Sequence, residues 1–131
     1  TSHSREQLLQ AEFSLSSSSD RMGFVLDGPA VECVSPAERV SSGVTTGTIQ
    51  GLPNGKMIVL MADHQTTGGY PRIGQVSLTS LPALAQYRPG NRFTFQLTDE
   101  KTAEEQYLTL QCRWKEILQR CREKISSWLP S

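Results

Sequence analysis

The sequence has few of the residues that build disulfide frameworks or transition-metal sites. Of its 131 residues, three are cysteine and two are histidine. No two cysteines have Cys-x-x-Cys spacing, and His3 and His64 lie far apart. The odd cysteine count argues against a disulfide scaffold, and the scatter of both residue types argues against a metal cluster. We therefore expect a protein of a reducing compartment, the cytoplasm, with no metal site.

An excess of charge and long apolar runs are also absent. Thirteen basic residues balance thirteen acidic ones, so the net charge is zero. A neutral chain lacks the positive field that attracts nucleic acid, and we expect no nucleic-acid partner. No apolar run approaches the roughly 20 residues of a membrane span, so no membrane association is expected. The chain begins with Thr1 and not Met, which suggests processing or a start inside a longer protein.

The clearest local signal is a β-hairpin. Thr48–Gln50 leads into a turn containing Asn54 and Gly55, and Met57–Met61 returns. Asn-Gly tolerates the positive φ angles that tight hairpin turns need. The returning run is continuously apolar, which predicts a strand buried on both faces.

Other segments predict further strands and one short helix. Ser14–Ser19 is compatible with a loop or with a polar edge strand. Strands are expected over Arg21–Leu26, Ala30–Val34, Ile73–Leu78 and Arg92–Leu97, the last with Phe93, Phe95 and Leu97 on one face, and a short helix over Leu81–Tyr87. The pattern predicts a mainly β fold, a β-barrel with short helices.

The C-terminal segment differs in kind. Apolar residues recur at intervals of three and four, which predicts an amphipathic helix over about 103–128. This stripe consists of Tyr107, Leu110, Trp114, Ile117, Leu118, Cys121, Ile125 and Trp128. We expect Thr102 as N-cap with Glu105 three residues later, and the stripe packed against the barrel or a partner. The expected organisation is an N-terminal extension (1–17), a barrel half-domain (18–100) and a C-terminal helix (101–131).

One short stretch gathers most of the side chains able to do chemistry. Residues 62–75 contain Asp63, His64, Gln65, Tyr70 and Arg72 directly after the buried strand. The adjacent Gly68 and Gly69 allow the backbone to approach a ligand, or simply to turn. The competing interpretation is a polar turn between two strands. No Walker loop, nucleophile elbow or zinc signature occurs.

Two further positions have a pattern that is associated with ligands or cofactors. Arg21 begins an apolar run, where an arginine either points into a cleft to pair with a carboxylate or phosphate, or is solvated. Lys56-Met57 is similar to the lysine context of a biotin acceptor. Gly55 stands where such acceptors have methionine, so we expect no covalent biotin on this chain.

Three segments resemble one known family. They are Ser19-Asp20-Arg21-Met22-Gly23, Gly47-Thr48-Ile49-Gln50 and Asp63-His64-Gln65-Thr66-Thr67-Gly68-Gly69-Tyr70-Pro71-Arg72-Ile73-Gly74. Together they resemble the allophanate hydrolase subunit 2 family, which includes the C subunit of bacterial 5-oxoprolinase, the KipA proteins and the carboxyltransferase domain of urea carboxylase. The resemblance covers about 18–95 and corresponds to the C-terminal half of the family.

The resemblance implies a cyclophilin-like β-barrel and a role in ATP-dependent activation and ring-opening of 5-oxoproline. On residue chemistry we assign Asp63, Gln65 and Tyr70 as catalytic candidates. Arg21, Gly68, Gly69 and Arg72 are candidates for substrate or phosphate binding. The implied cofactor is ATP with Mg in the full assembly, and a chain of this extent is expected to be inactive in isolation.

The implied partners are an allophanate hydrolase subunit 1-like (KipI or oxoprolinase B-like) subunit and a LamB/YcsF-like subunit. Two alternatives stay open at this point. One is a KipA-like regulatory binding protein that counters a kinase inhibitor. The other is the carboxyltransferase part of a urea carboxylase or allophanate system.

Overall fold

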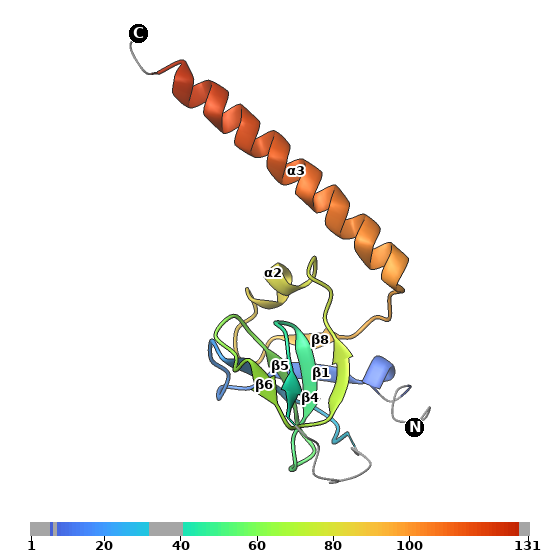
Figure 1. Cartoon of the computed structure of the whole chain (residues 1–131). Coiled ribbons are helices and arrows are strands. Elements are labelled where there is room, and N and C mark those ends of the chain that lie inside the picture. The colour runs from blue at the N-terminus through green and yellow to red at the C-terminus, as the bar shows by residue number, and fades with distance from the viewer. Residues whose placement is uncertain (1–5, 7, 32–40, 129–131) are drawn as a thin grey trace. The chain divides into compact units, whose positions relative to one another are not determined.

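The computed structural model describes residues 6, 8–31 and 41–128. The chain forms two compact units, Thr1–Leu97 and Thr98–Ser131. The first is mainly β and the second is a single long helix (Figure 1). The predicted fold class, a mainly β barrel with short helices and a long C-terminal helix, is confirmed, and the sheet of the first unit is a curled half-barrel.

The first unit is built on a six-stranded sheet with the order β7-β4-β5-β2-β1-β8. Each neighbouring pair of strands is antiparallel. A small antiparallel ribbon pairs β3 with β6. The strands are β1 (Glu12–Leu15), β2 (Gly23–Asp27), β3 (Ser42–Gly43), β4 (Thr48–Gly51), β5 (Met57–Leu60), β6 (Thr67–Gly68), β7 (Arg72–Gln75) and β8 (Arg92–Thr94).

The predicted hairpin is β4 and β5, with Ile49 opposite Val59 and Gly51 opposite Met57. Gly55 has φ +79° in the turn, a conformation that glycine adopts without strain. Met57, Val59 and Leu60 of β5 are all buried, as the continuous apolar run predicts. These strands occupy the middle of the sheet, so both their edges are paired and their hydrogen bonds lie inside the fold.

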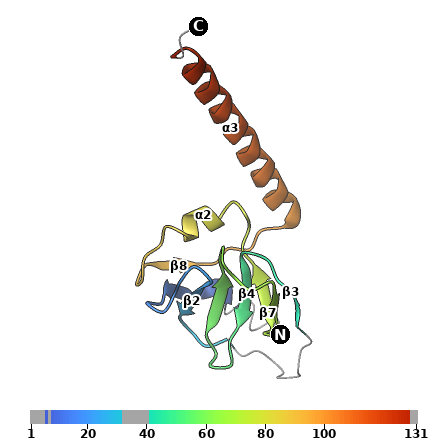
Figure 2. The same ribbon diagram turned by 60° about the vertical axis from the view of Figure 1, so that its left-hand side comes forward.

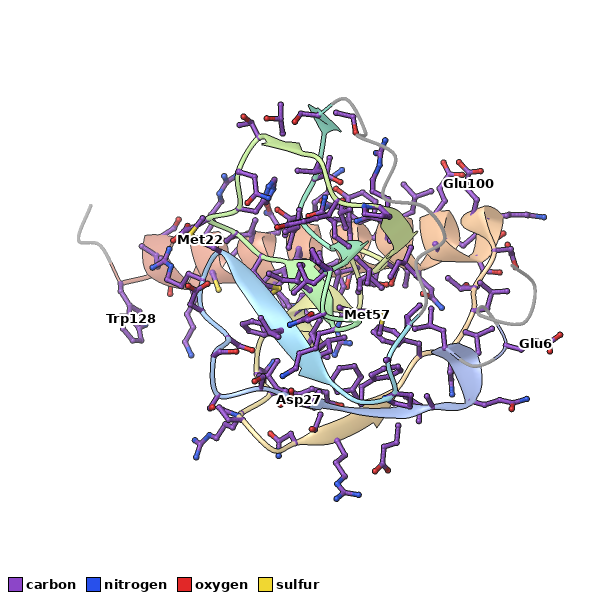
Figure 3. The ribbon with its side chains drawn as sticks, turned by 90° about the horizontal axis from the view of Figure 1, so that it is seen from below. Glu6, Met22, Asp27, Met57, Glu100 and Trp128 are labelled. Carbon is purple, nitrogen blue, oxygen red and sulfur yellow. The ribbon has the colours of Figure 1, made fainter. Side chains whose placement is uncertain are left out.

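A single apolar cluster holds the sheet in shape. Figure 3 shows Met57 in the middle of the first unit, with Met22 and Asp27 beside opposite ends of β2. The buried members of the cluster are Phe13, Leu15, Leu26, Ile49, Met57, Val59, Met61, Leu81 and Leu84. Phe13 also contacts the ring of Phe95, with the centroids 5.6 Å apart. The cluster therefore joins β1, β2, β4 and β5 to the short helix α2.

The other strand predictions hold with shifted bounds. Arg21–Leu26 corresponds to β2, Ile73–Leu78 to β7, and Arg92–Leu97 to β8. The serine-rich stretch, which the sequence left open between loop and strand, contributes Ser14 and Leu15 to β1 and forms a turn at Ser17 and Ser18. The strand predicted over 30–34 lies mostly outside the described residues, and Ala30 and Val31 are not in a strand. The alternation of β8 fails at Leu97, which is 64% exposed.

The short helix α2 spans Leu81–Leu84, with proline in its first turn as predicted (Figure 2). It ends earlier than the predicted Tyr87. Leu81 and Leu84 are buried against the core cluster. α2 thus closes an apolar surface that the sheet alone leaves open.

The second unit is α3, which spans Glu100–Ser126. Its N-cap is Asp99, and the predicted cap at Thr102 is wrong. The Asp99 carboxylate accepts hydrogen bonds from the Thr102 amide at 2.8 Å and from its hydroxyl at 2.9 Å. Aspartate satisfies the free amides of the first turn and complements the helix dipole, so it displaces the threonine as cap.

No residue of α3 between Glu100 and Ser126 is buried. Packing of its apolar stripe against the barrel or a partner therefore stays a prediction, as do the domain divisions at 17/18 and 100/101. Among the described residues, no helix is long and apolar enough to cross a membrane.

Candidate functional site

The stretch from Asp63 to Gln75 leaves the end of β5, forms β6 and then becomes β7. β6 pairs with β3, with Gly68 opposite Ser42 and Thr67 opposite Gly43. β7 pairs with β4 on the other side. The glycine-rich motif is thus a structured ribbon that leads from the middle of the sheet to its edge, and it is more than a simple turn between two strands.

Two of the predicted site residues form an ion pair. The Arg21 Nε lies 2.7 Å from Asp63 Oδ2, and Arg21 Nη2 donates to Asp63 Oδ1 at 3.2 Å. The backbone keeps them adjacent, because the Asp63 amide donates to the Arg21 carbonyl at 3.0 Å. The two side chains are 84% and 49% exposed, so the pair contributes little stability but presents a guanidinium in a fixed direction.

The polar face of β4 lies under the ribbon. Side chains alternate along a strand, so Thr48 and Gln50 point away from the core residue Ile49. Both are buried nonetheless, with Gln50 0% exposed. A Cβ added at Gly68 would lie 2.6 Å from Gln50 Nε2. Glycine at this position of the motif lets the ribbon rest directly on the Gln50 amide, which a larger side chain would displace.

Only one end of the Gln50 side-chain amide is hydrogen-bonded. Its Nε2 donates to the Tyr70 carbonyl at 3.4 Å, and its Oε1 has no hydrogen-bond partner among the described residues. The register between β4 and β7 shifts between Ile49 and Gln50. Such bulges re-aim side chains and are frequent beside active sites. An acceptor oxygen buried beneath the motif without a partner is the most unusual polar group of the described fold.

A second glutamine at the same place is fully engaged. Gln75 Oε1 accepts from the Thr48 hydroxyl at 3.0 Å, and its Nε2 donates to the Thr46 carbonyl at 2.8 Å. Gly47, with φ +87°, brings the backbone close to this amide, since an added Cβ would lie 2.8 Å from Gln75 Nε2. These contacts fix the loop before β4 against the end of β7.

The remaining predicted residues lie along the exposed side of the ribbon. Tyr70 is 47% exposed, and Arg72 Nη1 donates to the Gly43 carbonyl at 3.4 Å. Gln65 and Gly69 are exposed, and Gly68 is half-buried. His64 is half-buried and contacts the Gln65 carbonyl through Nδ1.

The contacts of the described residues divide the candidates into two groups. Arg21 and Asp63 form one. Gly68, Tyr70 and Arg72 form the other, around Gln50 and the β3–β6 ribbon. Sequence reasoning placed Gln50 and Gln75 inside motif segments but gave neither a role. The available signal was polarity, because Gln50 is the one amide side chain within the two strands of a hairpin whose second strand is continuously apolar.

Another ion pair of the first unit involves the turn of the β4–β5 hairpin. Lys56 Nζ lies 2.6 Å from Asp27 Oδ1. This hydrogen bond, with a further one from Ser16, lowers the pKa of the Asp27 carboxyl below its usual range. Lys56 thus belongs to an exposed ion pair between β2 and the turn before β5. In the described part of the chain, no three His, Cys, Asp or Glu side chains gather as a metal site would require.

Comparison with known proteins identifies the family. The family model described as carboxyltransferase domain, subdomain A and B, matches residues 1–97. The chain belongs to this family. Within it, the chain is 46% identical over 85 residues to the 5-oxoprolinase C subunit of Haemophilus influenzae, covering 65% of this chain and 28% of the relative. It is 39% identical over 92 residues to that of Escherichia coli, covering 70% and 30%.

Solved structures with the same fold include the crystal structure of TTHA0988. That likeness has a TM-score of 0.64 and 32% identity, and it covers 74% of this chain and 19% of the other. The urea amidolyase of K. lactis has a TM-score of 0.72 at 19% identity, covering 79% and 7%, which shows the shared fold alone. This carboxyltransferase-family chain spans less than a third of the length of the curated relatives.

Proposed function

We propose that this chain is the C-terminal part of a protein like the C subunit of 5-oxoprolinase. In this role it acts with partner subunits in the ATP-dependent activation and ring-opening of 5-oxoproline. The observation that carries the proposal is the 46% identity to a 5-oxoprolinase C subunit over 85 residues. The relatives are named as one subunit of that enzyme, which implies further subunits there. Here the proposed partners are an oxoprolinase B-like (KipI-like) subunit and a LamB/YcsF-like subunit, in the cytoplasm.

The geometry supports a role in binding and polarising a small lactam. A lactam carbonyl resists attack because its carbon–nitrogen bond is resonance-stabilised, and preorganised donors at the oxygen lower that barrier. Arg21, held by Asp63, offers a directed cation. The exposed Tyr70 hydroxyl offers a neutral donor beside the ribbon. Gly68 and Gly69 leave the backbone open to close approach.

The described residues hold only part of what a nucleotide site needs. Mg-ATP requires oxygen ligands for the metal and several donors for the phosphates. Among the described residues, no three His, Cys, Asp or Glu side chains gather to hold a metal ion. If ATP is the cofactor, most of its contacts come from outside this chain.

The test is a chimaera in which this chain replaces the matching segment of the Haemophilus influenzae C subunit. ADP and glutamate formed from 5-oxoproline are measured with both partner subunits present. We expect 5-oxoproline-dependent activity in the chimaera and none from the chain alone. No activity in a folded, assembled chimaera would overturn the proposal.

Matched substitutions locate the site within the active chimaera. Asp63→Asn removes a 49% exposed carboxylate from an ion pair, and Asp27→Asn removes a 43% exposed carboxylate from another. Tyr70→Phe has Tyr87→Phe as its control, since Tyr87 is 38% exposed and stacks on Phe93. We expect the two site variants to lose on the order of 100-fold in turnover, as for a lost contact at a reacting centre, and the two controls to keep it. Equal losses of turnover in the site and control variants would show that residues 63–72 form a polar surface ribbon without a part in the reaction.

A further inference from the structure

The apolar residues of helix α3 repeat every seven positions. This pattern is stricter than the one an amphipathic helix needs to cover a globular core. Naming Tyr107 position a, the a positions of the helix are Tyr107, Trp114 and Cys121, the d positions are Ala103, Leu110, Ile117 and Lys124, and Trp128 stands at the next a position, in the turn that follows the helix. Seven of these eight residues are apolar or aromatic. A straight helix with a 3.6-residue period drifts across such a repeat, whereas two supercoiled helices keep it as a continuous seam. The repeat therefore indicates a coiled-coil partner.

The seam is exposed along α3 and the turn that follows it. Trp114 is 54% exposed, Ile117 42% and Trp128 77%. A tryptophan offers up to roughly 250 Å² for burial, so the two tryptophans alone expose about 300 Å² on each helix. Tyrosine, leucine and isoleucine add to this. Two such helices therefore bury more than the roughly 1,000 Å² that a specific interface needs.

We propose that α3 pairs with α3 of a second copy of this chain in an antiparallel coiled coil. A second copy supplies the same repeat at the same length, about 40 Å for 27 residues, so the whole seam is covered by one contact. The alternatives are that the chain's own barrel or an unrelated protein covers the seam, and the test below separates them.

Charge decides the direction of the pair. Residues 100–112 carry three glutamates and one lysine, a net charge of −2, whereas 113–126 carry five basic and two acidic residues, a net charge of +3. An antiparallel pair sets the acidic half of each helix against the basic half of the other, and opposes the two helix dipoles. A parallel pair would instead bring two Lys124 side chains together at a d position, where like charges are unfavourable.

The antiparallel register follows from matching large residues to small ones. Centring the two-fold axis between Lys115 and Glu116 sets Trp128 opposite Ala103 of the second copy, and Trp114 opposite its Ile117. Cys121 then faces Leu110 of the second copy. Lys124 faces Tyr107 there, next to Glu104, so its charge gains an acidic neighbour. Each layer joins an a position to a d position, as antiparallel coils require.

The first test is the mass of the whole chain in solution, measured by sedimentation equilibrium across a wide concentration range. We expect twice the 14.5 kDa of one chain. Leu110→Glu places a charge in the seam. Leu108→Glu makes the same change two residues away, outside the a and d positions, and is the control. Leu110→Glu should raise Kd by more than about 100-fold, because two leucines leave the interface, whereas Leu108→Glu should leave Kd nearly unchanged.

The second test reports direction and does not depend on a disruptive variant. In a background of Cys33→Ser and Cys112→Ser, only Cys121 remains. Oxidation should give no covalent dimer from Cys121 alone, and an efficient one once Leu110→Cys is added, since 110 and 121 face each other only in the antiparallel register. Efficient Cys121–Cys121 linkage would show a parallel coil and overturn the stated direction. A chain that stays monomeric at every concentration would overturn the proposal and assign the seam to the barrel or to another protein.

Discussion

The buried amide of Gln50 gives the sharpest stability prediction. Gln50 is 0% exposed, its Oε1 has no partner in the part of the chain that the structure describes, and its Nε2 makes one 3.4 Å bond to the Tyr70 carbonyl. Gln50→Met keeps the length and approximate volume of the side chain and removes both polar atoms. The substitution therefore asks whether this amide stabilises the fold or costs it free energy.

The expected sign follows from two opposing terms. A buried acceptor without a partner costs about 1–3 kcal/mol. The bond that is lost is long, and Tyr70 is exposed, so water replaces it and the loss is roughly 0.5 kcal/mol. Gln50→Met should thus raise the free energy of unfolding by about 1 kcal/mol. For a unit of this size the change corresponds to roughly 4–8 °C in Tm.

Urea unfolding followed by circular dichroism measures the change, with Gln75→Met, at an exposed glutamine whose amide is bonded at both ends, as the comparison. Gln75 uses both ends of its amide, so the same substitution there should cost about 1–2 kcal/mol. The reasoning requires opposite signs for the two glutamines. If Gln50→Met destabilises the unit by more than about 1 kcal/mol, Oε1 has a strong partner in solution and the argument is refuted.

Two further predictions concern the ribbon and the helix cap. Gly68→Ala should cost up to about 1 kcal/mol in urea unfolding, because its Cβ would lie 2.6 Å from Gln50 Nε2 and would displace that buried amide; Gly43→Ala, whose Cβ meets nothing within 4 Å, is the control. Hydrogen bonds from the Thr102 amide and hydroxyl lower the pKa of Asp99 below 3.8, so the cap stabilises α3 above that pH and is lost as pH falls through the lowered value. Helix content measured by circular dichroism should fall in that acid range in the wild type, and Asp99→Asn, which keeps a cap without the charge, should remove this pH dependence.

The sequence predicted an element best where a single local pattern determined whether the segment is a strand or a helix. The β4–β5 hairpin follows from Asn54-Gly55 and a continuously apolar strand, and α3 follows from intervals of three and four. The cap was misplaced because Thr102 and Glu105 form a capping-box pattern. Asp99 lies three residues earlier, and its carboxylate caps the helix by accepting a hydrogen bond from the Thr102 amide. Several strand ends were predicted wrongly because tertiary contacts, and not the local sequence pattern, determine where those strands end. In the sequence Leu97 continues the alternating pattern of β8, but in the structure it lies beyond Thr94, the last paired residue of that strand.

The candidate site was predicted in its residues but not in its arrangement. Arg21 and Asp63 are 42 positions apart. They meet because the ladder between β2 and β5 continues beyond the end of each strand, which requires knowledge of the strand order. The role of Gln50 depends on the β3–β6 ribbon. Ser42–Gly43 and Thr67–Gly68 are each two residues long and have no hydrophobic period of their own, so no sequence pattern marks them as strands.

The position of Gln50 connects the stability argument to the proposed activity. An unsatisfied buried oxygen lowers the stability of a fold that is only marginally stable, so such a group persists where it serves a purpose. Here it lies directly beneath Gly68 and beside Tyr70, both within the glycine-rich motif. If Gln50→Met both stabilises the unit and lowers turnover in the chimaera, the amide is retained for the reaction. If it stabilises the unit and turnover is unchanged, the ribbon is supported by packing alone, and the chemistry rests on Arg21 and Asp63.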